Sequence, residues 1–444
     1  MAIFNRDSDD EVARGARAVV VHAETHGADR RDSDARLEEA RGLALAIGID
    51  VRAGHSFRVR DRKPATLFGS GQVDQIAMLV RQEEAELVIV DNALSPVQQS
   101  NLEKACEAKV IDRTGLILEI FGERAATNEG RLQVELAHLD YQAGRLVRSW
   151  THLERQRGGF GFLGGPGETQ IEADRRMIRD RMAKIRKELE QVTRTRGLHR
   201  ARRQKAPWPV IALVGYTNAG KSTLFNRMTG ADVMAEDLLF ATLDPTMRQI
   251  ALPGLDKAIL SDTVGFVSDL PTQLIAAFRA TLEEVLSADL IVHVRDIAHP
   301  DSEAQRDDVL DVLGALGVAG EGALSKDGEA NEPVPMIEAW NKLDLLDGEA
   351  AALAQESAAR RDDVVILSAL TGEGVDALQR AISTRLTAGA RVHRLRLGAN
   401  DGAGLAWLHE HGEVLDAHVE DDAMLVEARL SDAAAAKFLK RERA

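Results

Sequence analysis

VIALVGYTNAGKSTLFNRMTG, residues 210–230, is the stretch that decides the fold. Its first five residues have the β-branched, apolar character of a buried strand, and its last part has the composition of a helix. Between them, Gly215–Ser222 matches G-x-x-x-x-G-K-[ST], the loop whose backbone N–H groups surround nucleotide phosphates. We therefore expect a P-loop domain in which Lys221 reaches the β- and γ-phosphates and the Ser222 hydroxyl binds Mg²⁺.

A second motif, LFATLDPT at residues 239–246, follows the P-loop and has the character of a switch loop that becomes ordered with a nucleoside triphosphate. The hydroxyls of Thr242 and Thr246 are both candidates for the second protein ligand of Mg²⁺. We favour Thr242, because Asp244–Pro245 forces a turn directly after it.

The third motif, DTVG at residues 262–265, ends a strand-like run. Asp262 is placed to hold the Mg²⁺ shell, and the N–H of Gly265 can sense the γ-phosphate. Ras-like switches carry a glutamine after this glycine to orient water, but here the residue is Phe266, which has no hydrogen-bonding group. We expect slow intrinsic hydrolysis, with the missing group supplied by a partner, a backbone-held water or K⁺; Asn218 either serves such a cation or shapes the P-loop.

Two further motifs predict the base that is bound. In NKLD, residues 341–344, the carboxylate of Asp344 can accept both the ring N–H and the exocyclic amine of guanine, whereas adenine lacks this donor pair. SAL, residues 368–370, follows a strand and offers a backbone N–H to the guanine carbonyl. These motifs select GTP over ATP.

Long helices are predicted before the P-loop by two heptad seams. Apolar residues alternate at spacings of four and three, and they are Leu132, Leu136, Leu139, Ala143, Leu146, Trp150 and Leu153, then Ile171, Ile178, Met182, Ile185, Leu189 and Val192. Such helices form an antiparallel hairpin, which projects about 40 Å at 1.5 Å per residue. Its glycine-rich tip, 157–167, carries Phe160 and Phe162, which either stack on RNA bases or cap the hairpin core.

The rest of the chain alternates strand-like and helix-like runs. In the N-terminal part we expect strands at 17–24, 50–60, 87–91 and 110–113, with helices at 33–47, 70–84 and 95–109. The fold class is multidomain α/β, and its four parts are an N-terminal α/β domain (1–125), the antiparallel helical hairpin (126–205), a P-loop GTPase domain with a mostly parallel sheet (206–389) and a small C-terminal α+β domain (390–444). A stretch rich in glycine and acids at 317–335 is expected to be an exposed loop.

The composition excludes several classes of protein. No run approaches the roughly 18 apolar residues of a membrane span, and the charged N-terminus lacks a secretory apolar core, so we expect a cytoplasmic protein without integral membrane association. The net charge of −15 argues against general nucleic-acid or DNA binding. Residues 145–205, however, hold 17 Lys and Arg against 7 Asp and Glu, which indicates either a local polyanion contact or a solvated helical face.

Taken in order, the five motifs resemble those of translation-factor GTPases, and GGFGFLGGPGETQIEADRR, 158–176, with its basic helix resembles the HflX family of ribosome-associated GTPases. The resemblance implies binding of the large ribosomal subunit and its RNA, and the splitting or rescue of stalled or idle ribosomes by a Mg²⁺-dependent, partner-stimulated GTPase. It implies catalytic roles for Lys221, Thr242 and Gly265, with Mg²⁺ on Ser222 and Thr242. The GTP/GDP site would comprise Gly215, Tyr216, Thr217, Asn218, Ala219, Gly220, Lys221, Ser222, Phe240, Ala241, Thr242, Leu243, Asp244, Asp262, Thr263, Val264, Gly265, Asn341, Lys342, Leu343, Asp344, Ser368, Ala369 and Leu370.

Two alternatives stay open from the residues alone. The basic hairpin could dock protein partners, which would make the chain a signalling GTPase; such an arm would show little salt-dependent affinity for RNA. The N-terminal domain could be an independent enzyme or hold a second nucleotide, although no nucleophile is paired with a base there. We expect a monomer.

Overall fold

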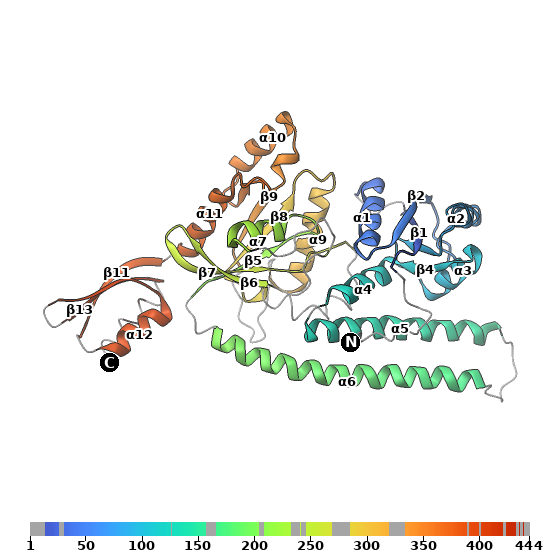
Figure 1. Ribbon diagram of the computed structural model, residues 1–444, viewed down its shortest axis with the longest axis horizontal. Helices are drawn as coiled ribbons and strands as arrows, with labels where there is room; N and C mark the ends of the chain where they lie inside the picture. Colours follow the sequence, from blue (N-terminus) through green and yellow to red (C-terminus); the bar gives the residue numbers. More distant parts are fainter. Residues whose placement is uncertain are drawn as a thin grey trace.

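The fold of the chain is taken from a computed structural model (Figure 1). It describes residues 14–25, 31–125, 127–156, 166–203, 208–231, 240, 246–268, 285–318, 334–388, 390–398, 401–420, 423–431, 435 and 438. The multidomain α/β architecture is confirmed: an N-terminal α/β unit, two long helices, a P-loop unit and a small C-terminal unit follow one another along the chain. The limits of the four domains remain the divisions that we propose.

The N-terminal unit is a parallel sheet flanked by helices. Its described strands lie in the order β2-β1-β3-β4, and every pair is parallel, as expected from strands separated by helices. The elements are β1 (Arg17–Thr25), α1 (Ser33–Ala46), β2 (Asp50–Val59), α2 (Ser70–Gln82), β3 (Leu87–Val90), α3 (Pro96–Cys106), β4 (Lys109–Asp112) and α4 (Arg113–Arg124). The predicted strands and helices are confirmed to within a few residues.

Local chemistry explains where these helices begin. The Ser95 hydroxyl accepts from the N–H of Gln98 while the Gln98 side chain accepts from the N–H of Ser95, a capping box with Pro96 at the first helical position. Helix α4 was not predicted; it is mostly apolar and keeps Thr114, Glu119 and Glu123 at least partly exposed. Leu116, Ile117 and Phe121 are buried in it, along with their neighbours.

The two long helices are α5 (Asn128–Gln156) and α6 (Pro166–Arg203), which lie side by side and antiparallel in Figure 1. Of the seam residues whose side chains are described, three are buried: Leu132, Met182 and Ile185. The other described ones, Leu136, Leu139, Ala143, Ile178, Leu189 and Val192, are half-buried. The guanidinium of Arg181 also pairs with Glu135 across the helices, with Nε and Oε1 2.6 Å apart. Of the expected tip, 157–167, residues 157–165 lie outside the described residues, and 166–167 begin α6.

Helix α5 has a second buried face that the seam did not predict. Val134 and Ala137 belong to the same apolar cluster as α4. Beside them, the carboxylate of Asp112 accepts from Tyr141 Oη at 2.6 Å and from Arg145 Nη2 at 2.9 Å. The hairpin is therefore joined to the N-terminal sheet by packing and by buried hydrogen bonds.

The P-loop unit is built on a sheet in the order β10-β9-β8-β5-β7-β6, parallel except for β6. Its described elements are β5 (Val210–Val214), α7 (Lys221–Thr229), β6 (Thr246–Leu252), β7 (Leu255–Asp262), β8 (Leu290–Asp296), α9 (Ser302–Ala315), β9 (Met336–Asn341), the 3₁₀ turn η1 (Leu343–Leu345), α10 (Gly348–Ala359), β10 (Val364–Ile366) and α11 (Val375–Thr387). The mostly parallel sheet is confirmed. Most of the loop expected at 317–335 lies outside the described residues.

The C-terminal unit pairs an antiparallel sheet with a helix. The described strands lie in the order β11-β13-β12, and the elements are β11 (Ala390–Gly398), α12 (Gly402–His411), β12 (Glu413–Glu420) and β13 (Ala423–Ser431). No helix in the described part of the chain is both long and apolar enough to cross a bilayer.

The N-terminal and P-loop units share one apolar core. The cluster that holds Leu116, Ile117 and Phe121 of α4 also holds Val264 and Phe266 of the P-loop unit. The rings of Phe121 and Phe240 meet edge to face with centroids 4.7 Å apart. Nucleotide-site segments are thus packed directly on the N-terminal unit.

We predict that Asp112→Ala destabilises the N-terminal unit by about 3 kcal/mol, because the buried donors of Tyr141, Arg145 and the α4 N-terminus lose their acceptor. The midpoint of urea unfolding measures this loss. The matched control is Asp74→Ala, which removes an exposed carboxylate on α2 and should change the free energy of unfolding by no more than about 0.5 kcal/mol. Equal midpoints for the two variants would contradict the prediction.

Candidate functional site

The P-loop turns from β5 into α7 through two glycines with positive φ. Gly215 has φ 153° and Gly220 has φ 92°. A Cβ at Gly215 would collide with the Val294 carbonyl, and one at Gly220 would collide with the Asn341 side chain. Glycine is therefore required at both ends of the loop for the backbone to approach β8 and NKLD.

Lys221 is buried at the start of α7, with 6% of its surface exposed. Its Nζ donates to the carbonyls of Gly215 at 3.0 Å and Tyr216 at 2.7 Å. Burial lowers the pKa of Lys221 to about 8, and the charge of Asp262 opposes this only in part. The ammonium group is therefore held inside the loop that would surround the phosphates.

The residues expected at Mg²⁺ fit that ion. Ser222 Oγ donates to Asp262 Oδ2 at 2.8 Å, and Asp262 is fully buried. A hydroxyl and a carboxylate side by side are hard oxygen donors of the kind that Mg²⁺ prefers when nucleotide phosphates complete its shell. Thr242, the other expected ligand, lies outside the described residues, as do Ala241, Leu243 and Asp244.

The DTVG segment lies against the P-loop. A Cβ on Gly265 would come within 3.1 Å of Lys221 Nζ and 2.9 Å of a Thr217 side-chain carbon. Its neighbour Phe266 donates its N–H to Gly215 O at 3.1 Å and accepts from the Thr217 N–H at 2.7 Å. The Phe266 side chain is buried in the shared core, so it faces protein and not the nucleotide site.

The three loops at the base-binding end are linked by Asn341. Its Nδ2 donates to Ala219 O at 2.8 Å and its Oδ1 accepts from Ala369 N at 2.8 Å. The Ser368 hydroxyl donates to Asp344 Oδ1. One buried asparagine therefore sets the distance between the P-loop, NKLD and SAL. The carboxylate of Asp344 has further lone pairs with which it can accept hydrogen bonds from a base.

One positioning residue was not predicted. Arg227, on α7, donates from Nε to Ala369 O at 3.1 Å and from Nη2 to Leu370 O. Nothing in the sequence around Arg227 signals this contact, because it depends on the tertiary approach of α7 to SAL.

The structure also bears on Asn218. This residue has φ 59°, a left-handed conformation that asparagine adopts more readily than most residues, and it is exposed. This conformation supports the loop-shaping role of Asn218, and its cation role stays a prediction.

Comparison with protein families gives a match for each part of the chain. Residues 34–122 match the GTP-binding GTPase N-terminal family, and residues 124–203 match the GTP-binding GTPase middle region. Residues 210–319 match a family described as 50S ribosome-binding GTPase, and residues 352–443 match the HflX C-terminal domain.

Curated relatives match over most of their length. GTPase HflX of Magnetococcus marinus is 47% identical, covering 91% of this chain and 90% of that protein. GTPase HflX of Escherichia coli K12 is 43% identical, covering 88% of each. A crystal structure of a GTP-binding protein from Sulfolobus solfataricus with GDP is 23% identical over 84% of this chain and 99% of that chain, with a TM-score of 0.44.

We predict that Asp344→Asn changes the preferred base from guanine to xanthine. Asparagine presents an amide donor to guanine's N–H pair, and the unpaired donors cost about 1–3 kcal/mol, roughly tenfold to a hundredfold in affinity. Xanthine offers a carbonyl to the new donor. Calorimetric titration with GTP, xanthosine triphosphate and ATP measures the change. Asp347→Asn, which keeps the N-cap of α10, is the control and should bind GTP normally; equal binding of ATP and GTP by the unaltered chain would refute the assignment.

We also predict that nucleotide binding takes up a proton near pH 8. Contact with a triphosphate raises the pKa of Lys221 above the value of about 8 that burial imposes. The contribution of Lys221 to affinity is therefore complete below pH 8 and is lost as the pH rises above it. At pH 8 we expect uptake of about half a proton per nucleotide, and at pH 7 about a tenth. Calorimetry in two buffers of different ionisation enthalpy measures this, and an absence of uptake at pH 8 would contradict it.

Proposed function

The chain belongs to the HflX family of GTPases, and on that premise we propose that it couples GTP hydrolysis to association with the large ribosomal subunit. Membership makes it an enzyme that binds GTP and hydrolyses it to GDP and phosphate. The family described as 50S ribosome-binding GTPase, which matches the P-loop unit, supports the partner.

The exposed basic face of α6 is the observation that carries this proposal. Around the buried seam residues Met182 and Ile185, the described part of the helix exposes more cations than acids. The exposed cations are Arg176, Arg179, Lys184, Arg186 and Lys187, and the exposed acids are Glu172, Asp180 and Glu190. A row of cations over an acidic chain suits the phosphate backbone of RNA, whose binding is driven by release of counterions. Together with the match of the P-loop unit to the 50S ribosome-binding GTPase family, these cations support ribosomal RNA as the main contact of the hairpin.

We assign the phosphate contacts to Lys221, Ser222 and Gly265, which lie together around the P-loop. Lys221 would bind the β- and γ-phosphates, and Ser222 with Thr242 would hold Mg²⁺, which neutralises charge on the phosphates when bound. The Gly265 N–H would face the γ-phosphate, and Asp344 would accept from guanine. Whether K⁺ adds to this set is an outcome of comparing turnover in KCl and NaCl.

Burial of Phe266 supports a partner-stimulated reaction. Its side chain is enclosed in the core between two units, so it leaves the attacking water without a side-chain partner at this position. We propose that the large subunit orders the attacking water. We also propose that the GTP-dependent association splits or rescues stalled or idle ribosomes.

We predict that the combined variant Arg179→Ala, Lys184→Ala and Lys187→Ala co-sediments more weakly with large subunits in the presence of a non-hydrolysable GTP analogue. The slope of log affinity against log salt concentration should fall by about one for each phosphate contact that is lost. Ribosome-stimulated hydrolysis should fall, while basal hydrolysis and GTP affinity stay unchanged. Excising 158–165 should abolish the stimulation.

The control removes three exposed cations of the N-terminal unit, Arg60, Arg62 and Lys104, and should bind large subunits normally. Equal losses in both triple variants would contradict the assignment of the RNA contact to the hairpin. Unchanged affinity, salt dependence and stimulation in the α6 variant would mean that the arm is only a solvated spacer.

A further inference from the structure

The loop after β10, which holds SAL at residues 368–370, is bound by two neighbouring elements. Asn341, at the end of β9, accepts the Ala369 N–H on its Oδ1 at 2.8 Å. Arg227, in the last turn of α7, donates from Nε to the Ala369 carbonyl at 3.1 Å and from Nη2 to the Leu370 carbonyl. One guanidinium therefore holds two consecutive carbonyls of the loop that we expect to contact the base.

The backbone after SAL is shaped to receive this arginine. Gly372 has φ 94°, a conformation that favours glycine, and a Cβ there would come within 3.2 Å of Arg227 Nη1. The Gly372 N–H also donates to Ser368 O at 2.8 Å, which closes the turn around SAL. Although Arg227 is exposed, its contact with the loop is thus matched by the fold of the loop.

Hydrogen bonding within the loop leaves one N–H of SAL for a base. The Ser368 N–H donates to Glu373 O at 2.9 Å, and the Ala369 N–H is taken by Asn341. The Leu370 N–H has no acceptor among the described residues, and 67% of the Leu370 surface is exposed. Leu370 is therefore the residue of this motif that can donate to the guanine carbonyl.

The contact with Arg227 sets the direction of that N–H. No peptide bond in the described part of the chain is cis, so the peptide that joins Ala369 to Leu370 is planar and trans. In such a peptide the C=O and the N–H point in opposite directions. Because Arg227 holds the Ala369 carbonyl toward α7, the Leu370 N–H is directed away from α7.

We propose that Arg227 is a positioning residue for guanine specificity, which acts by aiming the Leu370 N–H at the carbonyl on C6 of the base. Guanine presents an acceptor at this position, whereas adenine presents an amine donor. A donor in a fixed direction therefore favours guanine and leaves the adenine amine unpaired. The inference rests on the proposed contact of Asp344 with the base, which the Ser368 hydroxyl joins to the same loop.

Arg227→Ala tests the proposal with diphosphates that are altered at one position of the base. 6-Thio-GDP carries sulfur, a weak acceptor, in place of the C6 oxygen, and inosine diphosphate lacks the exocyclic amine assigned to Asp344. We expect the unaltered chain to bind GDP about fivefold more tightly than 6-thio-GDP, and the variant to bind the two within about twofold. The ratio of GDP affinity to inosine diphosphate affinity should not change, because Asp344 remains in place. Calorimetric titration of the full chain with Mg²⁺ present measures both ratios.

The matched control is Arg385→Ala, which removes another exposed arginine that donates to a backbone carbonyl, that of Asp362, at 3.1 Å. Both ratios should equal those of the unaltered chain. Arg227→Lys keeps the charge without the planar fork, so its preference for GDP over 6-thio-GDP should be intermediate.

Three results would overturn the proposal: no preference for GDP over 6-thio-GDP in the unaltered chain, a preserved preference in folded Arg227→Ala, or an equal loss of both ratios in that variant. Failure of the underlying base assignment would give a different result, because the unaltered chain would then bind GDP no more tightly than ADP. That result would overturn this proposal as well. All titrations use the chain without ribosomes, so they do not depend on the proposed partner.

Discussion

The packing of the P-loop unit onto α4 is the constraint from which the rest of the arrangement follows. Phe266 and Val264 are buried in a core that the N-terminal unit completes, and Phe240 packs edge to face on Phe121. Separating the two units would expose these apolar side chains to water, at about 25 cal/mol for each Å² uncovered. The segments that surround the nucleotide are therefore held in place partly by a neighbouring unit.

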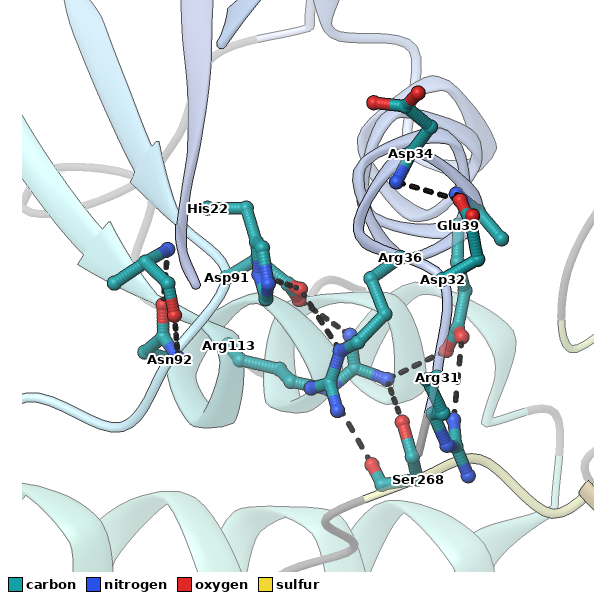
Figure 2. Close-up of polar contacts among 12 residues, drawn as sticks. His22, Arg31, Asp32, Asp34, Arg36, Glu39, Asp91, Asn92, Arg113 and Ser268 are labelled. Atoms are coloured by element: carbon teal, nitrogen blue, oxygen red, sulfur yellow. Dashed lines mark hydrogen bonds and ion pairs between the residues drawn. The ribbon is translucent and has the colours of Figure 1, made fainter. Parts of the chain in front are cut away.

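Polar groups at the edge of that core make the docking specific. Arg113 is a charge with almost no exposure, and such a charge is tolerated only when it is paired and hydrogen-bonded. Its partners, Asp91, Glu39 and Ser268, come from the end of β3, from α1 and from the segment after DTVG (Figure 2). A shift of either unit would leave a buried guanidinium without acceptors, so the network favours one relative position more strongly than apolar packing alone would.

The same contacts join the basic hairpin to the nucleotide site in a continuous series. Arg181 of α6 pairs with Glu135 of α5, Tyr141 of α5 bonds to Asp112, and the next residue is Arg113. Arg113 in turn donates to Ser268, so contacts run from the hairpin to the segment after DTVG. Such contacts make energetic coupling between the hairpin and the nucleotide site feasible. Non-additive effects of variants at the two places would demonstrate that coupling.

The sequence by itself determined the local chemistry of this protein. The glycines and Lys221 of the P-loop, the order of five motifs and the two heptad seams depend on short spacings, and these predict strands, helices and nucleotide contacts without knowledge of the whole fold. Only the tertiary structure determined which residues make the contacts between the units. Helix α4 is mostly buried because the hairpin and the P-loop unit pack against it, Phe266 is enclosed by the N-terminal unit, and Arg227 reaches SAL across 142 residues of chain. The meeting of Arg113 with Ser268 joins residues 155 apart. No periodicity or local motif encodes such contacts, because they arise from the relative placement of separately folded layers.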